Sequence, residues 1–253
     1  MRPHALLFAL LAGLFAPGAI APAFAASQYV IISAEPASQG LEPGRVLELS
    51  ETLDVPEGVT VTLLGEDGTV NAVPGPANVT VTDNGVGSAQ SDQKRSALAK
   101  VAGLLAGENK NAQSLGAARG MNDGSGGADA PKIEPWAIPV DRDGNGCARG
   151  AQVLIGRDNP REVLAIALER EGERIAELTW PKGDSFLDLP AARIAELSEF
   201  EIRASGKRVL VSLHRLPAEV AEDDALAVLG WMIDHGCDRQ AVAFARDLAQ
   251  QAQ

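Results

Sequence analysis

Two cysteines, Cys147 and Cys237, constrain the fold of this chain more than any other feature of its 253 residues. A disulfide between them would close a loop of about 90 residues, which stabilises a fold by roughly 4–5 kcal/mol in the chain-entropy description. It would also hold the C-terminal region against the middle of the chain. Whether the thiols pair depends on the compartment in which the protein folds, because disulfides persist in oxidising environments.

The first 25 residues have the pattern of a secretory signal peptide. A short basic segment precedes an apolar run at residues 5–16, and Ala23-Phe24-Ala25 supplies the small residues that a signal peptidase reads. The run of about 12 residues is shorter than the roughly 20 needed to cross a bilayer. We therefore expect cleavage after Ala25 and a periplasmic or secreted protein with no membrane span after cleavage.

Export favours a structural disulfide between Cys147 and Cys237. The alternatives are two buried free thiols or a redox-active pair. A catalytic thiol pair usually has a Cys-x-x-Cys spacing at the start of a helix, and that spacing is absent here.

Residues 26–87 are predicted to form a small acidic β domain. Short β-branched runs at 29–32, 45–49, 59–64 and 78–81 are separated by turn signals such as Asp67-Gly68. Nine acidic residues stand against one base, Arg45, between residues 27 and 87. This excess of negative charge repels nucleic acid and anionic lipid, so any ligand of this domain is expected to be basic or neutral.

Residues 88–131 are predicted to be a helix followed by a flexible linker. Leu98, Val101, Leu104 and Leu105 share one face of an amphipathic helix over residues 91–105. From Gly107 onward the periodicity ends, and Gly, Asn, Ala and Ser dominate, as in flexible linkers. We place the boundary between two domains in this segment.

Residues 132–253 are predicted to be an antiparallel β sandwich with a terminal helical hairpin, so that the whole chain is mainly β. Short strands at spacings of roughly 8–12 residues are typical of a sandwich. Pro217 suits the first turn of one helix, Gly236 its end, and Asp238 the cap of a second. Cys237 lies at the bend, so the disulfide would attach the hairpin to the sandwich. The predicted strands cover residues 136–140, 151–155, 163–168, 174–180, 185–189, 200–204 and 208–213.

Three turn signals follow one another in residues 52–81: Val55-Pro56-Glu57-Gly58, Gly65-Glu66-Asp67-Gly68 and Gly75-Pro76. With the runs between them, they resemble a FecR-type periplasmic β domain. FecR proteins normally have a membrane anchor and a cytoplasmic anti-sigma segment, and we expect neither here, so the signalling role is not carried over. The C-terminal region is similar to uncharacterised exported proteobacterial proteins in Asn145-Gly146-Cys147, Trp180-Pro181, Leu216-Pro217 and Gly236-Cys237-Asp238-Arg239-Gln240-Ala241.

Asp141-Arg142-Asp143-Gly144-Asn145-Gly146 matches the first half of a calcium-binding EF-hand loop. Asp141, Asp143 and Asn145 would supply oxygen ligands, and Gly146 would allow the sharp turn. Gln152 stands where the loop needs a bidentate carboxylate, so a hairpin turn between residues 136–140 and 151–155 is the other interpretation. Calcium is the only cofactor that the sequence suggests.

Several function classes are disfavoured by composition. A net charge of -12 argues against nucleic-acid binding, and an aromatic content of 4% argues against a sugar-stacking cleft. His214 and His235 are the only histidines outside the N-terminus, and neither has a Ser or Cys at a suggestive spacing. The three tryptophans, Trp136, Trp180 and Trp231, lie in apolar patterns that indicate packing. No catalytic residue is assigned.

The sequence therefore predicts a non-catalytic periplasmic interaction module of the cell envelope, with a protein partner of unknown identity. A small periplasmic hydrolase that uses carboxylates, and a calcium-stabilised adhesion-type module, are the alternatives.

Overall fold

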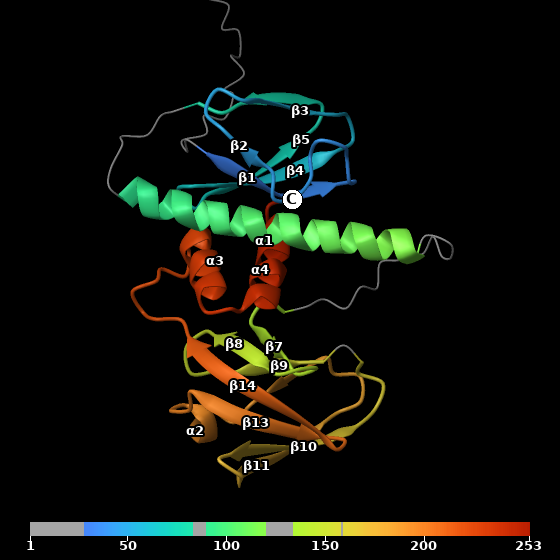
Figure 1. Cartoon of the computed structure of the whole chain (residues 1–253), viewed down its shortest axis with the longest axis vertical. Helices are drawn as coiled ribbons and strands as arrows, with labels where there is room; N and C mark the ends of the chain where they lie inside the picture. Colours follow the sequence, from blue (N-terminus) through green and yellow to red (C-terminus); the bar gives the residue numbers. More distant parts are fainter. Residues whose placement is uncertain (1–27, 83–89, 120–133, 158) are drawn as a thin grey trace, which may run out of the picture.

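The computed structural model describes residues 28–82, 90–119, 134–157 and 159–253. It has three tiers: an N-terminal β unit, a layer of helices, and a C-terminal β sandwich (Figure 1). The predicted fold class is confirmed, since the chain is mainly β and ends in a helical hairpin. The predicted signal peptide lies outside the described residues.

The N-terminal unit has two sheets packed face to face. A four-stranded sheet has the order β2-β1-β4-β5, and β3 pairs with β6 in a second, two-stranded sheet. All of these pairs are antiparallel. The sequence did not indicate β3 and β5, because both are short and only partly apolar. The strands are β1 (Tyr29–Glu35), β2 (Val46–Leu47), β3 (Thr52–Val55), β4 (Thr60–Gly65), β5 (Val70–Pro74) and β6 (Ala77–Thr80).

Strand β1 is buried on both faces. Tyr29 and Ile31 pack between the two sheets, whereas Val30 and Ile32 point to the opposite face and join the core formed with the helices. Successive side chains of a strand alternate between faces, so a continuous apolar run requires cover on both sides. The helices provide the second cover.

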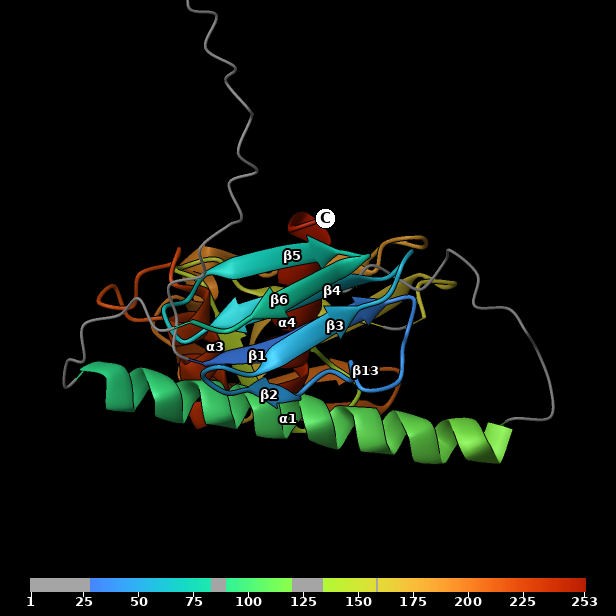
Figure 2. The same ribbon diagram turned by 90° about the horizontal axis from the view of Figure 1, so that it is seen from above.

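Helix α1 (Gln90–Arg119) is twice as long as the sequence indicates and passes the ends of the β unit (Figure 2). The prediction ended the helix at residue 105 because the apolar stripe ends there: Leu98, Val101 and Leu105 pack on the core. Helix-forming residues continue to Arg119 without an apolar face, so the backbone stays helical where the stripe is absent. The predicted linker therefore begins later, and residues 120–131 lie outside the described part.

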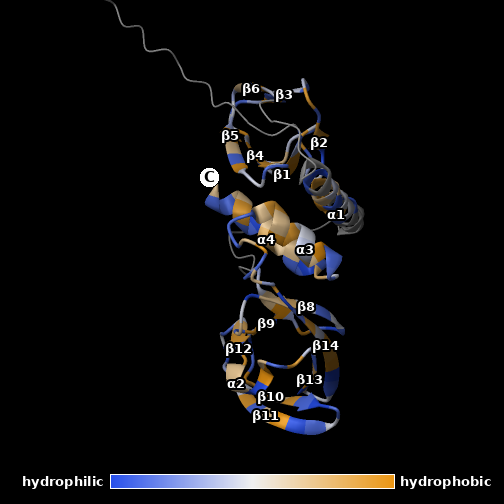
Figure 3. Cartoon of the chain, turned by 90° about the vertical axis from the view of Figure 1, so that its left-hand side faces the viewer, coloured by the Kyte–Doolittle hydropathy of each residue, from blue (hydrophilic) through white to orange (hydrophobic). Residues whose placement is uncertain are grey.

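The C-terminal hairpin consists of α3 (Ala225–Asp234) and α4 (Asp238–Gln251). The first helix begins eight residues after Pro217, where the Asp224 carboxylate accepts a hydrogen bond from the Ala227 N–H. The helix therefore begins later than the Pro217 pattern predicted. The reason is the Asp224 side chain, which satisfies a free N–H at the start of the helix. The hairpin lies between the two β parts and packs on α1 and on the N-terminal sheet (Figure 3).

The sandwich has a five-stranded sheet, β11-β10-β13-β14-β8, against a three-stranded sheet, β12-β9-β7. Two of its pairs are parallel, β14 with β8 and β7 with β9, which departs from the antiparallel prediction. A short helix, α2 (Ala191–Ile194), follows β12. The strands are β7 (Ala137–Pro139), β8 (Gly144–Ala148), β9 (Leu154–Gly156), β10 (Leu164–Arg170), β11 (Glu173–Trp180), β12 (Phe186–Asp188), β13 (Glu199–Ala204) and β14 (Lys207–Arg215).

The β7·β9 pair is parallel because β8 stands between these strands in the sequence but lies in the other sheet. The hairpin turn predicted between residues 136–140 and 151–155 is therefore wrong. The chain leaves β7, crosses to β8 and returns to β9 beside β7 in the same direction. Gly146 permits this crossing, since a Cβ at this position would lie 2.6 Å from the Ile138 Cδ1 of β7.

Candidate functional site

The sandwich contains a cavity of about 420 Å³ between its two sheets. Its apolar lining combines partly exposed side chains, Val140, Leu164 and Ala204, with Ile166, Ile202 and Val209, which are only 2–6% exposed. Its polar lining comes from the loop after β9 and from the start of β14, where Lys207 is exposed. Apolar walls with a few polar groups, at a volume between about 300 and 1,000 Å³, are typical of small-ligand sites.

An indole and a guanidinium stand together in the lining of this cavity. Trp180, at the end of β11, is 0% exposed, and the Arg157 Cζ lies 4.8 Å from the centre of its ring. Arg157 is fixed by three carbonyl oxygens, to which its Nε, Nη1 and Nη2 donate: those of Asp184, Glu162 and Pro181. A cation over an indole face is attractive, so the pair is held in one geometry.

The Trp180 indole N–H has no hydrogen-bond partner within the part of the chain that the structure describes. Buried donors nearly always have a partner, so an unpaired one needs an explanation. The apolar pattern around Trp180 predicted packing, and nothing in the sequence singled out Arg157. No local signal identifies the pair, because the loop after β9 meets the end of β11 only in the folded chain.

A second group of side chains surrounds the disulfide, which the structure forms between Cys147 of β8 and Cys237 before α4, as predicted. The two Cα atoms are 6.0 Å apart, and both residues are buried. The buried side-chain amide of Gln240 adds a second connection between α4 and β8. Its Nε2 donates to the Cys147 carbonyl, and its Oε1 accepts from the Cys147 N–H, each at 2.8 Å. Gln240 thus occupies the free edge of β8 as a neighbouring strand would.

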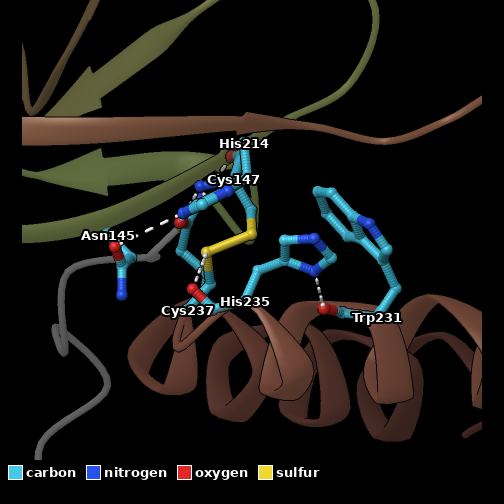
Figure 4. The surroundings of a disulfide bond; sticks show 7 residues. Asn145, Cys147, His214, Trp231, His235 and Cys237 are labelled. Carbon is cyan, nitrogen blue, oxygen red and sulfur yellow. Dashed lines mark hydrogen bonds between the residues drawn. A yellow bond between two sulfur atoms is a disulfide. The ribbon is translucent and has the colours of Figure 1, made fainter. Parts of the chain in front are cut away.

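The two histidines meet beside this disulfide (Figure 4). The ring centres of His214 and His235 are 4.9 Å apart, and the ring centres of His235 and Trp231 are 4.8 Å apart. The His235 Nδ1 donates to the Trp231 carbonyl oxygen at 2.8 Å. Burial, with the charge of His235, lowers the pKa of His214. Residue spacing did not reveal this contact. His214 pairs with Cys147 in the β14·β8 register, and the disulfide then brings Cys237, and with it His235, to the same place.

The three proposed calcium ligands have separate partners. Arg239 and Arg142 form ion pairs with the Asp141 carboxylate, and Asp143 accepts from the Leu210 N–H at 2.8 Å. The Asn145 Oδ1 lies 3.4 Å from the His214 Nε2. Burial alone would raise the pKa of Asp141, but the hydrogen bond and charge of Arg239 outweigh it and lower the pKa. Calcium binding at this loop stays a prediction.

Among the described residues, no three His, Cys, Asp or Glu side chains are arranged to hold a metal ion. The carboxyl groups with a shifted pKa are Glu42, Glu51 and Asp141. Backbone hydrogen bonds are the first cause of the lowering in Glu42 and Glu51, and all three pKa values move down. A general acid needs a raised pKa, so these three groups do not suit that role.

Comparison with known proteins finds no match: no family model fits the sequence, and no curated protein or solved structure is similar to this chain. No helix in the described ranges is both long and apolar enough to cross a membrane.

Proposed function

We propose that this chain is an exported, non-catalytic binding module of a bacterial cell envelope, and that it binds through the sandwich cavity. The observation that carries the proposal is the cavity itself: about 420 Å³, walled by apolar side chains and lined by a fixed Arg157–Trp180 pair. The buried disulfide and the leader-like N-terminus support an oxidising, periplasmic setting.

The resemblance of residues 52–81 to FecR-type domains agrees with this setting and forms part of the proposal. The role of the acidic N-terminal unit would be to keep the module dissolved and to repel anionic surfaces. A cavity of this size holds a small molecule or a single side chain of a protein partner, and its apolar walls would supply most of the binding free energy.

The test is titration with Nile red, an uncharged apolar dye whose emission rises in apolar surroundings. We expect the wild-type protein to bind it and the Ala204→Trp variant, with the cavity filled by an indole, to lose binding. Ala165→Trp is the matched control, because Ala165 is exposed on β10 and does not line the cavity. Thermal unfolding checks that both variants fold. Equal dye binding by both variants would overturn the proposal.

A further inference from the structure

We infer that His214 and His235 together bind one divalent transition-metal ion, with copper(II) preferred over zinc(II). This site is separate from the sandwich cavity, whose lining contains neither histidine. The inference therefore does not depend on the binding function proposed above.

The fold brings the two imidazole rings together and holds them there. His214 belongs to β14 and His235 directly follows α3. The disulfide between Cys147 and Cys237 fixes the place where these elements meet (Figure 4). Both histidines are partly exposed, so an ion can reach them from solvent. Ligands that are held in place before binding lose little conformational entropy when the ion enters.

Each ring has one nitrogen near an oxygen atom and one nitrogen without a partner. The His235 Nδ1 donates to the Trp231 carbonyl oxygen at 2.8 Å, and the His214 Nε2 lies 3.4 Å from the Asn145 Oδ1. A neutral imidazole has one N–H and one lone pair. An N–H directed at each oxygen leaves the lone pairs on the His235 Nε2 and the His214 Nδ1.

Neither of these two nitrogens has a hydrogen-bond partner among the described residues. Histidines that bind metals almost always donate the N–H of the other ring nitrogen to a carbonyl, a carboxylate or water. His235 has this arrangement with a backbone carbonyl, and His214 has it with a side-chain amide oxygen. Both rings are therefore oriented as metal ligands usually are.

The distance between the rings suits two ligands of one ion. A metal about 2.0 Å from a ring nitrogen lies roughly 3.2 Å from the centre of that ring. Two such ligands at an angle of about 90–110° at the metal have ring centres roughly 4.5–5.2 Å apart. The ring centres of His214 and His235 are 4.9 Å apart, and the ring planes are tilted by 57°. The spacing therefore matches a shared ion.

The ligand chemistry decides which ion is bound. Imidazole nitrogen suits copper, zinc, nickel and iron, whereas calcium and magnesium prefer oxygen ligands. For a given set of nitrogen ligands, copper(II) binds more tightly than zinc(II). Structural zinc sites have four protein ligands, and the described residues supply no group of three His, Cys, Asp or Glu here. Water would complete the coordination of the ion.

The experiment titrates the purified full chain with copper(II) in the presence of glycine, which competes for weak sites on the acidic surface. We expect one tightly bound ion per chain, and we expect electron spin echo spectra to detect two coordinated imidazoles. The ring centres of Trp231 and His235 are 4.8 Å apart, so bound copper should also quench tryptophan fluorescence. Zinc(II) should bind more weakly than copper(II).

Two variants remove one ligand each: His214→Gln and His235→Gln. We expect each to bind copper(II) at least roughly tenfold more weakly and to show one coordinated imidazole. Glu199→Gln is the control, because Glu199 is exposed at the start of β13 and its loss removes a charge but no imidazole. It should bind copper(II) as the wild type does. Thermal unfolding without metal checks that all three variants fold.

Two results would refute the inference: copper(II) bound to the wild type with fewer than two imidazoles, or equal copper affinity in the wild type and both histidine variants. Nile red binding should be the same in the wild type and in these variants, because the histidines do not line the cavity. The metal site and the proposed binding function can therefore fail separately.

Discussion

The two β parts of this protein are built alike but closed differently. In the N-terminal unit, the four-stranded sheet is covered by β3 and β6 on one face and by α1, α3 and α4 on the other. In the sandwich, no helix cluster in the described ranges covers the outer face of the five-stranded sheet, and β13 and β14 alternate between buried and exposed residues. One part is sealed by helices, and the other keeps a cavity between its sheets.

This difference indicates where binding can occur. A sheet buried on both faces has no surface to offer a ligand, and its interior is packed at close to crystal density. The sandwich buries one face of each sheet and leaves space at one end of its core. In the function we propose, the sealed part therefore provides stability, and the open part would provide the binding site.

The largest expected effect concerns the joint between the two parts. The double substitution Cys147→Ala and Cys237→Ala removes the disulfide, and we expect the free energy of unfolding to fall by about 2–5 kcal/mol. Urea denaturation followed by circular dichroism measures the change. An unchanged midpoint would mean that the contacts of Gln240 alone hold β8 against the helical hairpin. The disulfide would then contribute nothing to the connection between the two β parts.

The second prediction tests the sealed and the open core directly. Val61 is 0% exposed in the N-terminal core, and Val209 lines the cavity. Overpacking a filled core costs about 1–3 kcal/mol, so we expect that loss for Val61→Phe and less than about 1 kcal/mol for Val209→Phe, which has space to enter. Thermal unfolding of both variants provides the measurement. Equal losses would contradict the difference in closure.

The third prediction concerns pH. The folded protein lowers the pKa of His214 below 6.5, so the unfolded chain binds the proton more tightly. Stability is therefore full above pH 6.5 and decreases as the pH falls from 6.5 toward the folded pKa. Unfolding midpoints measured from about pH 8 to about pH 5 should show this decrease. His214→Gln should flatten it, and a variant as steep as wild type would locate the titration elsewhere.

The smallest expected effect is at the ion pair between Asp141 and Arg239, each 42% exposed in its side chain. Exposed ion pairs contribute about 0.2–1 kcal/mol, so Asp141→Asn should reduce stability by no more than that. The same variant tests the calcium prediction. If millimolar calcium raises the melting temperature of wild type and not of Asp141→Asn, the loop binds the ion.

Much of the fold could be predicted from the sequence because local patterns decide it. Alternation in residues 200–204 and 208–213, together with the polar turn between them, indicated β13 and β14 within two residues. The sequence also predicted the Cys147–Cys237 pair that the structure forms, because the export expected from the leader pattern would leave few alternatives for two thiols. The helix stop at Gly236 was also local, since a backbone φ of 69° there favours glycine.

The candidate site could not be predicted in the same way. Trp180 and Arg157 are both ordinary residues in the sequence, and their contact depends on how one loop lies over one strand end. His214 and His235 meet only because β14 pairs with β8 and the disulfide brings Cys237 to that strand. Such contacts depend on distant parts of the chain, and spacing carries no information about them.

The sequence by itself determined the β content and the final helical hairpin, because strand periodicity and turn chemistry depend on a few neighbouring residues. It also predicted the cysteine pair, because only two cysteines are present and the leader pattern predicts export. Only the tertiary structure decided which sheet the helices cover, which strands run parallel and where a cavity remains. The physical reason is that burial depends on which surfaces of the folded chain meet. The hairpin buries its apolar face against β1 and α1, so the helices do not cover the sandwich and its core stays open at one end.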